Sequence, residues 1–297
     1  IDLREKSDAL AGDIFYENIS ENGQTKFVDV TKKAGIFNSP LGYGLAIATS
    51  DINNDGFIDI YVGNDFHEND YLYINNGNKT FTESSADYFN HTSRFTMGVD
   101  IADITNDGNL DIMTLDMMPY KADIFLKSGG EDSDKVNQIK NSFGFQQQYA
   151  RNHMQLNKGK FFVDASLIAN TQATDWSWSP LIMDFNNDGL NDIYITNGIY
   201  KRPNDLDYIN YLSNFDFAKY NETLQDTLEQ KLINTMPMIN LPNVLFQNNG
   251  DLIFEKKLVD QNNTSTYSNG AAYSDLDLDG DLDIVVNNLN EKASLLE

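Results

Sequence analysis

One nine-residue pattern occurs four times in this chain and constrains the fold more than any other feature. It reads Asp-x-(Asn/Asp/Thr)-x-Asp-Gly-x-x-Asp, and the copies begin at Asp51, Asp103, Asp184 and Asp275. Side-chain oxygens at positions 1, 3, 5 and 9 can converge on one cation, because the glycine at position 6 permits the necessary sharp turn. Four copies between similar apolar runs indicate an internal repeat with a built-in metal loop.

The loops provide oxygen donors only, and this favours Ca²⁺, which takes several oxygens at about 2.3–2.6 Å, over the smaller Mg²⁺. We expect up to four calcium ions. The candidate ligands, with the seventh residue of each copy included, are Asp51, Asn53, Asp55, Phe57 and Asp59 in the first loop, Asp103, Thr105, Asp107, Asn109 and Asp111 in the second, Asp184, Asn186, Asp188, Leu190 and Asp192 in the third, and Asp275, Asp277, Asp279, Asp281 and Asp283 in the fourth.

An EF-hand shares the start of this motif but does not fit the rest of it. An EF-hand loop needs a bidentate Glu at position 12 and flanking helices. The twelfth residues here are Val62, Thr114, Ile195 and Val286. The flanks are short runs rich in β-branched residues, so each copy is predicted to be a strand, a metal loop and a second strand.

The chain is strongly acidic, with 45 Asp and Glu against 21 Lys and Arg and a formal net charge of −24. Thirteen of the carboxylates lie at the ligand positions of the loops, and four Ca²⁺ would reduce the net charge to −16. The remaining charge argues against binding to nucleic acid or to an anionic membrane. Because clustered carboxylates repel one another without a cation, we expect folding to be coupled to calcium.

Cysteine is absent, which excludes disulfides and thiolate metal sites. No apolar run approaches the ~18 residues that would span a bilayer. The chain begins IDLREKSDAL, without a visible signal peptide, and we expect it to be a piece of a longer protein.

The same order of strands surrounds each loop. A first strand leads into the loop, a second follows it, and a third and fourth form a hairpin closed by Asn-Gly or Lys-Gly. Four antiparallel strands per repeated unit are typical of a β-propeller blade, so we predict an all-β propeller with calcium loops between first and second strands. Small residues lie five positions before each loop, where an innermost strand would crowd the channel: Ala46, Gly98, Ser179 and Gly270.

The repeats predict one partial propeller over residues 1–297, with about four blades. Residues 13–31 read as the third and fourth strands of a blade, and residues 269–297 supply a first half that stops near a third strand. We expect an arc of a seven- or eight-bladed ring. The alternative is that the two half-blades close a four-bladed ring.

Two partly helical insertions interrupt the period, at about 117–150 and 199–242. Helix-forming residues without strand alternation occupy 132–143 and 215–236. Long insertions on a rigid scaffold often have a function. The alternative, helices that simply pack on the rim, stays open.

The loops, the strands that follow them and the Asn-Gly hairpins together resemble FG-GAP/VCBS repeats. The segments KFVDVTKKAG, HTSRFTMGVDIADITNDG and TDWSWSPLIMDFNNDG resemble, more narrowly, the large bacterial surface proteins that often carry a C-terminal ASPIC/UnbV domain; this chain contains no such segment. The second copy departs from the pattern, since Thr105 occupies position 3. We therefore expect the weakest calcium site there and the tightest in the fourth copy.

The resemblance implies a calcium-stabilised propeller outside the cell or on the outer-membrane surface of a Gram-negative bacterium, in some members as a lipoprotein. It implies binding or adhesion rather than catalysis. We expect a cell-surface binding or scaffold module for a protein partner or a glycan, and in a narrower version an accessory subunit of an outer-membrane nutrient-uptake complex. The alternative is an enzyme, a propeller-based polysaccharide lyase or another glycan-active enzyme.

A few side chains outside the loops are further candidates. Trp176 and Trp178 would face the same way on a strand, either as a stacking platform for a sugar or, as we favour, packed between blades. The chain has three histidines, His67, His91 and His153, without metal-ligand spacing, and we expect them to be structural or exposed.

A lyase would need basic side chains beside such histidines. Arg94 and Arg151 lie near His91 and His153 in the sequence, and either pair could serve an active site of that kind. We expect no catalytic residues in the preferred function.

Overall fold

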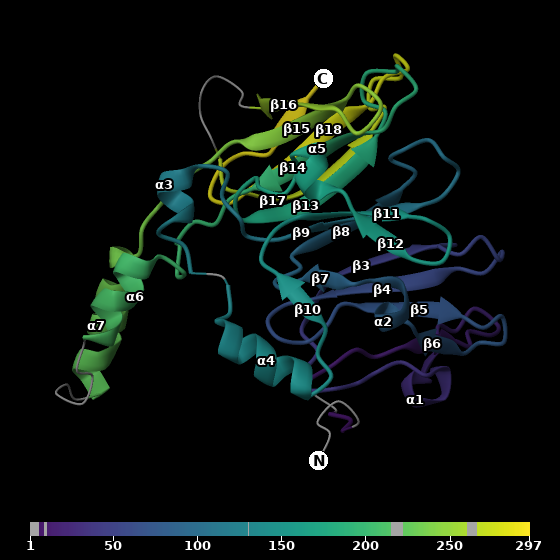
Figure 1. The fold of residues 1–297 in the computed structure, drawn as a ribbon, viewed down its shortest axis with the longest axis horizontal. Helices are drawn as coiled ribbons and strands as arrows, with labels where there is room; N and C mark the ends of the chain where they lie inside the picture. The colour runs from purple at the N-terminus through teal and green to yellow at the C-terminus, as the bar shows by residue number, and fades with distance from the viewer. Residues whose placement is uncertain (1–5, 9–10, 130, 215–221, 260–265) are drawn as a thin grey trace.

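The computed structural model describes residues 6–8, 11–129, 131–214, 222–259 and 266–297. Four antiparallel sheets follow one another in chain order and stack face to face as blades in a propeller arrangement (Figure 1). The predicted all-β propeller is confirmed.

Each blade has the predicted strand order. The first consists of β3 (Gly44–Ser50), β4 (Asp59–Asn64), β5 (Tyr71–Asn75) and β6 (Phe81–Glu83). The second consists of β8 (Gly98–Ala102), β9 (Asp111–Leu115), β11 (His153–Asn157) and β12 (Phe162–Asp164). The third consists of β13 (Ser177–Met183), β14 (Asp192–Asn197), β15 (Asn243–Asn248) and β16 (Phe254–Val259). The fourth consists of β17 (Ser268–Ser274), β18 (Asp283–Asn288) and β19 (Ser294–Leu296).

The hairpins between third and fourth strands turn where the sequence predicts. Their glycines adopt the left-handed conformation, with φ of 70° at Gly77, 83° at Gly159 and 80° at Gly250. Glycine has no Cβ to oppose this conformation, so these positions fix the register of the outer two strands.

Apolar side chains between neighbouring blades form the core. Tyr61 and Leu72 of the first blade pack with Ile112 and Phe162 of the second. A larger cluster joins the second and third blades and includes Met113, Met154, Ile193, Val244 and Phe246. The blades are therefore held together by the burial of both sheet faces, as in other repeat folds.

The first strands lie side by side along the inner edge, with β8 between β3 and β13, and β13 next to β17. The contact between β8 and β13 explains why the small residue at position 98 is a glycine. A Cβ on Gly98 would lie 1.9 Å from the Trp178 carbonyl oxygen, whereas a Cβ on Gly270 would meet nothing within 4 Å. The close packing at the inner edge therefore requires a glycine at position 98 but not at position 270.

The strand pair β1 (Tyr16–Asn18) and β2 (Phe27–Asp29) lies at one end of the stack, as residues 13–31 predict. The sheet of β17, β18 and β19 lies at the opposite end (Figure 1). The described residues thus form an arc and do not close a four-bladed ring. The number of blades in a complete ring stays a prediction.

The short helices α1 (Thr31–Ala34), α2 (Ser85–Tyr88) and α5 (Ser166–Ala169) follow fourth strands and connect the blades. The first insertion contains α3 (Ala122–Phe125), α4 (Asp134–Ser142) and β10 (Gln147–Tyr149), and β10 pairs in parallel with β7 (His91–Ser93). The second contains α6 (Leu206–Ser213) and α7 (Glu222–Thr235). The helix predicted over 132–143 is confirmed as α4, and that over 215–236 is confirmed as α7, with 215–221 outside the described residues.

We predict that Gly98→Ala lowers the stability of the folded chain by about 1–3 kcal/mol, because the new methyl group has no room against β13. The matched control is Gly270→Ala, at the same position of the repeat in open space, which should change stability by less than about 0.5 kcal/mol. Urea unfolding of both variants gives the comparison. Equal losses would show that the close approach at Gly98 does not restrict the fold.

Candidate calcium loops and the insertion face

The four Asp-rich loops share one backbone conformation. The fourth residue of each is left-handed, with φ of 58° at Asn54, 54° at Asn106, 58° at Asn187 and 66° at Leu278. The glycine at position 6 follows with φ of 90° at Gly56, 86° at Gly108, 89° at Gly189 and 100° at Gly280. The glycine turn that the sequence predicts is therefore present in all four copies.

The first aspartate organises each turn by accepting main-chain hydrogen bonds. In the first loop, Asp51 accepts the N–H of Asp55 at 2.9 Å and that of Gly56 at 2.8 Å. The aspartates at Asp103 and Asp184 repeat this arrangement. The carboxylate at position 5 in turn accepts the N–H of the seventh residue, at 2.9 Å from Phe57 to Asp55 and at 2.9 Å from Leu190 to Asp188.

The ninth aspartate is buried and fastens the loop to the blade. Asp59 accepts the N–H of Ile52, inside the loop, at 2.9 Å and the N–H of Asn75, at the end of the third strand, at 2.8 Å. Asp111 does the same with Ile104 and Asn157. The equivalent carboxylates Asp192 and Asp283 accept from Asn248 and Leu276 respectively. The ninth aspartate therefore links the loop to the third strand by hydrogen bonds. Its role as a metal ligand stays a prediction.

The donor set fits a hard cation best in the fourth loop. Asp275, Asp277 and Asp279 each bring one carboxylate oxygen to within 4.8 Å of the others. Within the described part of the chain, no lysine or arginine forms an ion pair with them. Burial, followed by the charge of Asp279, raises the pKa of Asp277. Like charges at this spacing repel, and a divalent cation held by oxygens would remove the repulsion.

The second loop differs from the others in two ways. The hydroxyl of Thr105 is buried without a hydrogen-bond partner, so position 3 contributes nothing to the hydrogen bonding of the turn. Lys158, on the neighbouring hairpin, places its Nζ 3.3 Å from Asp107. In addition, burial raises the pKa of Asp111 to about 6. A resident ammonium group and a bound proton would both compete with a cation here.

We predict that Lys158→Ala tightens calcium binding at the second loop, because it removes a positive charge next to a candidate ligand. Lys160→Ala, two residues along the same hairpin, is the control and should leave binding unchanged. Calorimetric calcium titration should show the weakest site strengthened severalfold in the first variant only. Weaker or unchanged binding in Lys158→Ala would contradict this account.

The two insertions meet at the edge opposite the loops, although they arise from different blades. The N–H of Leu206 donates to the Lys127 carbonyl at 2.7 Å, and the N–H of Gly129 donates to the Asn204 carbonyl at 2.8 Å. Lys127 also pairs with Asp207 at 3.0 Å, an exposed contact of small energetic value. The main-chain hydrogen bonds join the insertions into one surface, which we call the insertion face.

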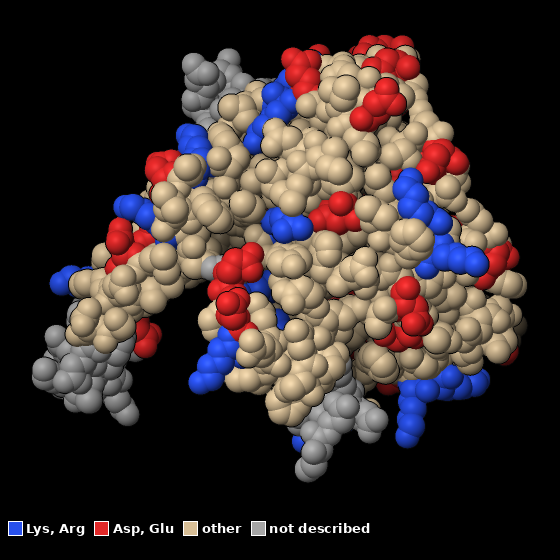
Figure 2. Space-filling model, in the orientation of Figure 1, with Lys and Arg blue, Asp and Glu red and all other residues tan. Residues whose placement is uncertain are grey.

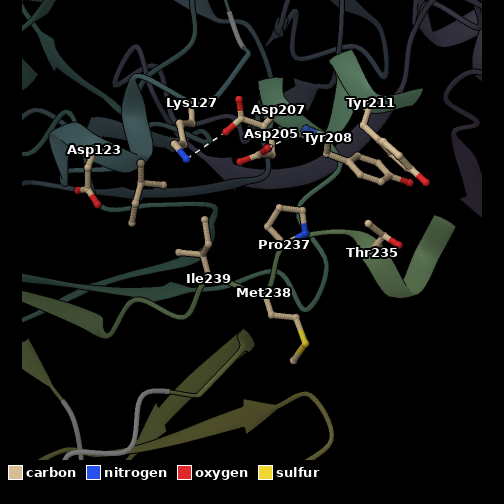
Figure 3. Close-up of a pocket in the computed structure, with 11 residues that line it drawn as sticks. Asp123, Lys127, Asp205, Asp207, Tyr208, Tyr211, Thr235, Pro237, Met238 and Ile239 are labelled. Carbon is tan, nitrogen blue, oxygen red and sulfur yellow. Dashed lines mark hydrogen bonds and ion pairs between the residues drawn. The ribbon is translucent and has the colours of Figure 1, made fainter. Parts of the chain in front are cut away.

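The insertion face contains a cavity of about 600 Å³ between α3, α6 and the segment after α7 (Figure 3). Its lining residues are Asp123, Ile124, Lys127, Asp205, Asp207, Tyr208, Tyr211, Thr235, Pro237, Met238 and Ile239. Tyr208 is buried and its hydroxyl donates to the Leu232 carbonyl at 3.2 Å, which connects α6 to α7. Tyr211 lines the cavity beside Tyr208 and is 42% exposed, so part of its side chain faces solvent.

A buried ion pair anchors the second insertion to the third blade. Arg202 is fully buried, and its Nη2 lies 2.6 and 2.8 Å from the two carboxylate oxygens of Asp175. The main-chain N–H of Arg202 donates to the Pro237 carbonyl at 3.0 Å. Loss of either charged partner would leave the other buried and unpaired, which is costly, so this pair fixes where the insertion leaves the blade.

Trp176 and Trp178 pack in an apolar cluster, as the sequence analysis favours. Trp176 is 9% exposed and packs with Phe95 and Met97, and Trp178 is partly buried in the same cluster. The indole N–H of Trp178 donates to the Gly198 carbonyl at 2.8 Å. They stiffen the base of the second insertion and do not form a stacking platform.

Two of the three histidines, which the sequence predicts to be structural or exposed, lie together in the fold. The rings of His91 and His153 lie 5.2 Å apart, and His91 contacts Asp164 at 3.1 Å. Burial lowers the pKa of His153 to about 3, so this ring is neutral. Sequence spacing could not reveal the cluster, because the two histidines are 62 residues apart. They meet only because β10, just before His153, pairs in parallel with β7, which contains His91.

The side chains named for a lyase converge in part: His91, His153 and Arg151 gather around Asp164, whereas Arg94 and Trp176 have other partners. Arg94 pairs with Asp132 at 2.8 Å, Trp176 is packed in its apolar cluster, and His91 contacts Asp164. His67 is exposed. The side chains that make up the insertion-face cavity were missed, since only the length of the insertions indicated a site there.

Charges of both signs are interspersed on the face shown in Figure 2, without a continuous basic area among the described residues. The absence of a nucleic-acid partner stays a prediction from the net charge. No helix in the described ranges is long and apolar enough to cross a membrane.

The fold and the repeated loops define a β-propeller built from Asp-rich repeats. Residues 51–114, from the first loop into the second blade, match the model of the FG-GAP-like repeat family, so the resemblance is confirmed for this segment. No curated protein matches the chain. Domains with such repeats are typically extracellular or surface-associated and generally bind proteins or other ligands.

Proposed function

We propose that this chain is a calcium-stabilised binding module of the cell surface that holds its ligand on the insertion face. The observation behind this proposal is the junction of two insertions from different blades around one cavity. Binding proteins commonly place their ligand sites on long loops that a rigid scaffold holds in position.

Calcium has a structural role in this proposal. The loops lie at the edge of the blades opposite the insertions (Figure 1), so bound ions would stabilise the scaffold without touching the ligand. Each ion would join the first and second strands of a blade through the carboxylates at positions 1, 3, 5 and 9. The clustered acids of the fourth loop and the repeated turn support this role.

The cavity lining favours a glycan over a protein segment as the ligand. Exposed Tyr211 offers a ring on which a sugar can stack, and Asp123 and Asp207 can accept hydrogen bonds from hydroxyl groups. With three carboxylates against one lysine, the cavity has a negative charge and would repel acidic sugars. We therefore propose a neutral or amino-sugar glycan.

The same charge argues against the alternative enzyme. A polysaccharide lyase acts beside the carboxylate of an acidic sugar, which this cavity disfavours. Of the side chains predicted for a lyase, Arg94 and Trp176 have partners of their own, and His91 and Arg151 share Asp164, outside this cavity. We propose a non-enzymatic role. Placement at the outer membrane, lipoprotein anchoring and association with an uptake complex are proposals that rest on the family resemblance alone.

A glycan array probed with the full chain in calcium tests this function. We expect retention of neutral or amino-sugar glycans, and Tyr211→Ala should weaken binding by about two- to tenfold, since a stacked ring contact contributes about 0.5–1.5 kcal/mol. Tyr43→Ala is the control, because Tyr43 is also exposed but lies on the first blade.

Two results would contradict the proposal. One is a wild-type chain that binds only acidic glycans or none. The other is an equal loss in Tyr211→Ala and Tyr43→Ala, which would place the binding site away from the insertion face.

A further inference from the structure

Three side chains distant in sequence meet at the start of the third strand of the second blade. His91 comes from β7, His153 from β11 and Asp164 from the end of β12. Each offers one ligand atom, and these atoms all lie within 4.8 Å of one another. The register of β11 with β9 pairs His153 with Thr114, near the end of β9 away from the Asp-rich loop. The cluster is therefore separate from the candidate calcium loops.

The His153 ring has no adequate polar partner in this position. The residue is fully buried, and neither ring nitrogen forms a hydrogen bond within ordinary distance and angle limits. A weak contact with the Arg151 main chain, outside those limits, is the smallest of the influences on the pKa of the ring. An unsatisfied buried imidazole is costly and calls for an explanation, of which a bound ion is one.

Two spacings in the cluster are close to those expected for tetrahedral coordination, and all three ligand atoms lie within 4.8 Å of one another. Zinc–nitrogen and zinc–oxygen bonds of about 2.0–2.2 Å place two imidazole centroids about 5 Å apart and neighbouring ligand atoms about 3.3 Å apart. The observed ring separation is 5.2 Å, and the distance from His91 Nε2 to Asp164 Oδ2 is 3.1 Å.

Further contacts hold the three ligands in place. Asp164 accepts the Ser166 N–H at 2.9 Å on one oxygen and Arg151 at 3.0 Å on the other. Gln155 donates to the His91 carbonyl at 3.1 Å. Hydrogen bonds of this kind orient ligating carboxylates and histidines in metal sites. Arg151 would lower the affinity for a cation but would also keep Asp164 ionised and oriented.

We propose that His91, His153 and Asp164 form a binding site for one divalent transition-metal ion of the zinc class. Two imidazoles and one carboxylate suit Zn²⁺ or Co²⁺ and not Ca²⁺, which prefers oxygens alone. Binding exchanges the His91–Asp164 hydrogen bond for bonds to the ion. The His91 side chain is 22% exposed, so an ion can reach the cluster from solvent, and a water molecule would complete the four ligands.

The test is cobalt titration of the untagged full chain in excess Ca²⁺, which saturates the oxygen sites. We expect one Co²⁺ per chain with a visible absorption band typical of a tetrahedral site. His91→Gln should remove the band and weaken binding by at least about tenfold. His67→Gln, which removes the exposed histidine, is the matched control and should change neither.

Absence of the cobalt band, or equal loss in His67→Gln and His91→Gln, would overturn the proposal. X-ray absorption of the zinc-loaded wild-type chain gives a second readout that does not depend on the folding of any variant. Two imidazole ligands would support the site, since His67 lies elsewhere on the surface. Scattering from oxygen ligands alone would refute it.

Discussion

The buried aspartate at the ninth position of each loop is the interaction on which the rest of the structure depends. Asp59 and its equivalents join the loop, the second strand and the end of the third strand through main-chain hydrogen bonds. The contact to the third strand recurs in the first three blades, and Asp283 of the fourth blade makes the contact to the loop, so the loops and strands are fixed relative to one another. A metal ion in the loop would act on an already organised turn, because the first aspartate accepts the main-chain N–H groups of that turn.

This rigid arrangement explains why function can reside on the opposite edge. The connections between second and third strands lie away from the loops, and two of them are long enough to meet each other across neighbouring blades (Figure 1). The buried Arg202–Asp175 pair and the tryptophan cluster hold the base of the second insertion. The insertion face can therefore vary in sequence without disturbing the blades, as binding surfaces on repeat scaffolds commonly do.

Local features of this fold could be predicted from sequence, and features that depend on tertiary contacts could not. The loops, hairpins and blade strands follow from glycine positions and apolar runs within about ten residues of each other. The parallel pairing of β7 with β10 and the cluster of His91 with His153 depend on how an insertion folds back, which no short pattern encodes. The bracing role of Asp111 was also hidden, because the motif identifies a carboxylate but not its burial.

The central claim is that calcium in the loops stabilises the blades. Calcium content and thermal unfolding of the purified chain, measured before and after chelation, test it most directly. The account predicts up to four tightly bound Ca²⁺ per chain and a large drop in melting temperature on chelation, because thirteen clustered carboxylates would lose their counter-ions. A chain without bound calcium, or with the same melting curve in chelator, would contradict it.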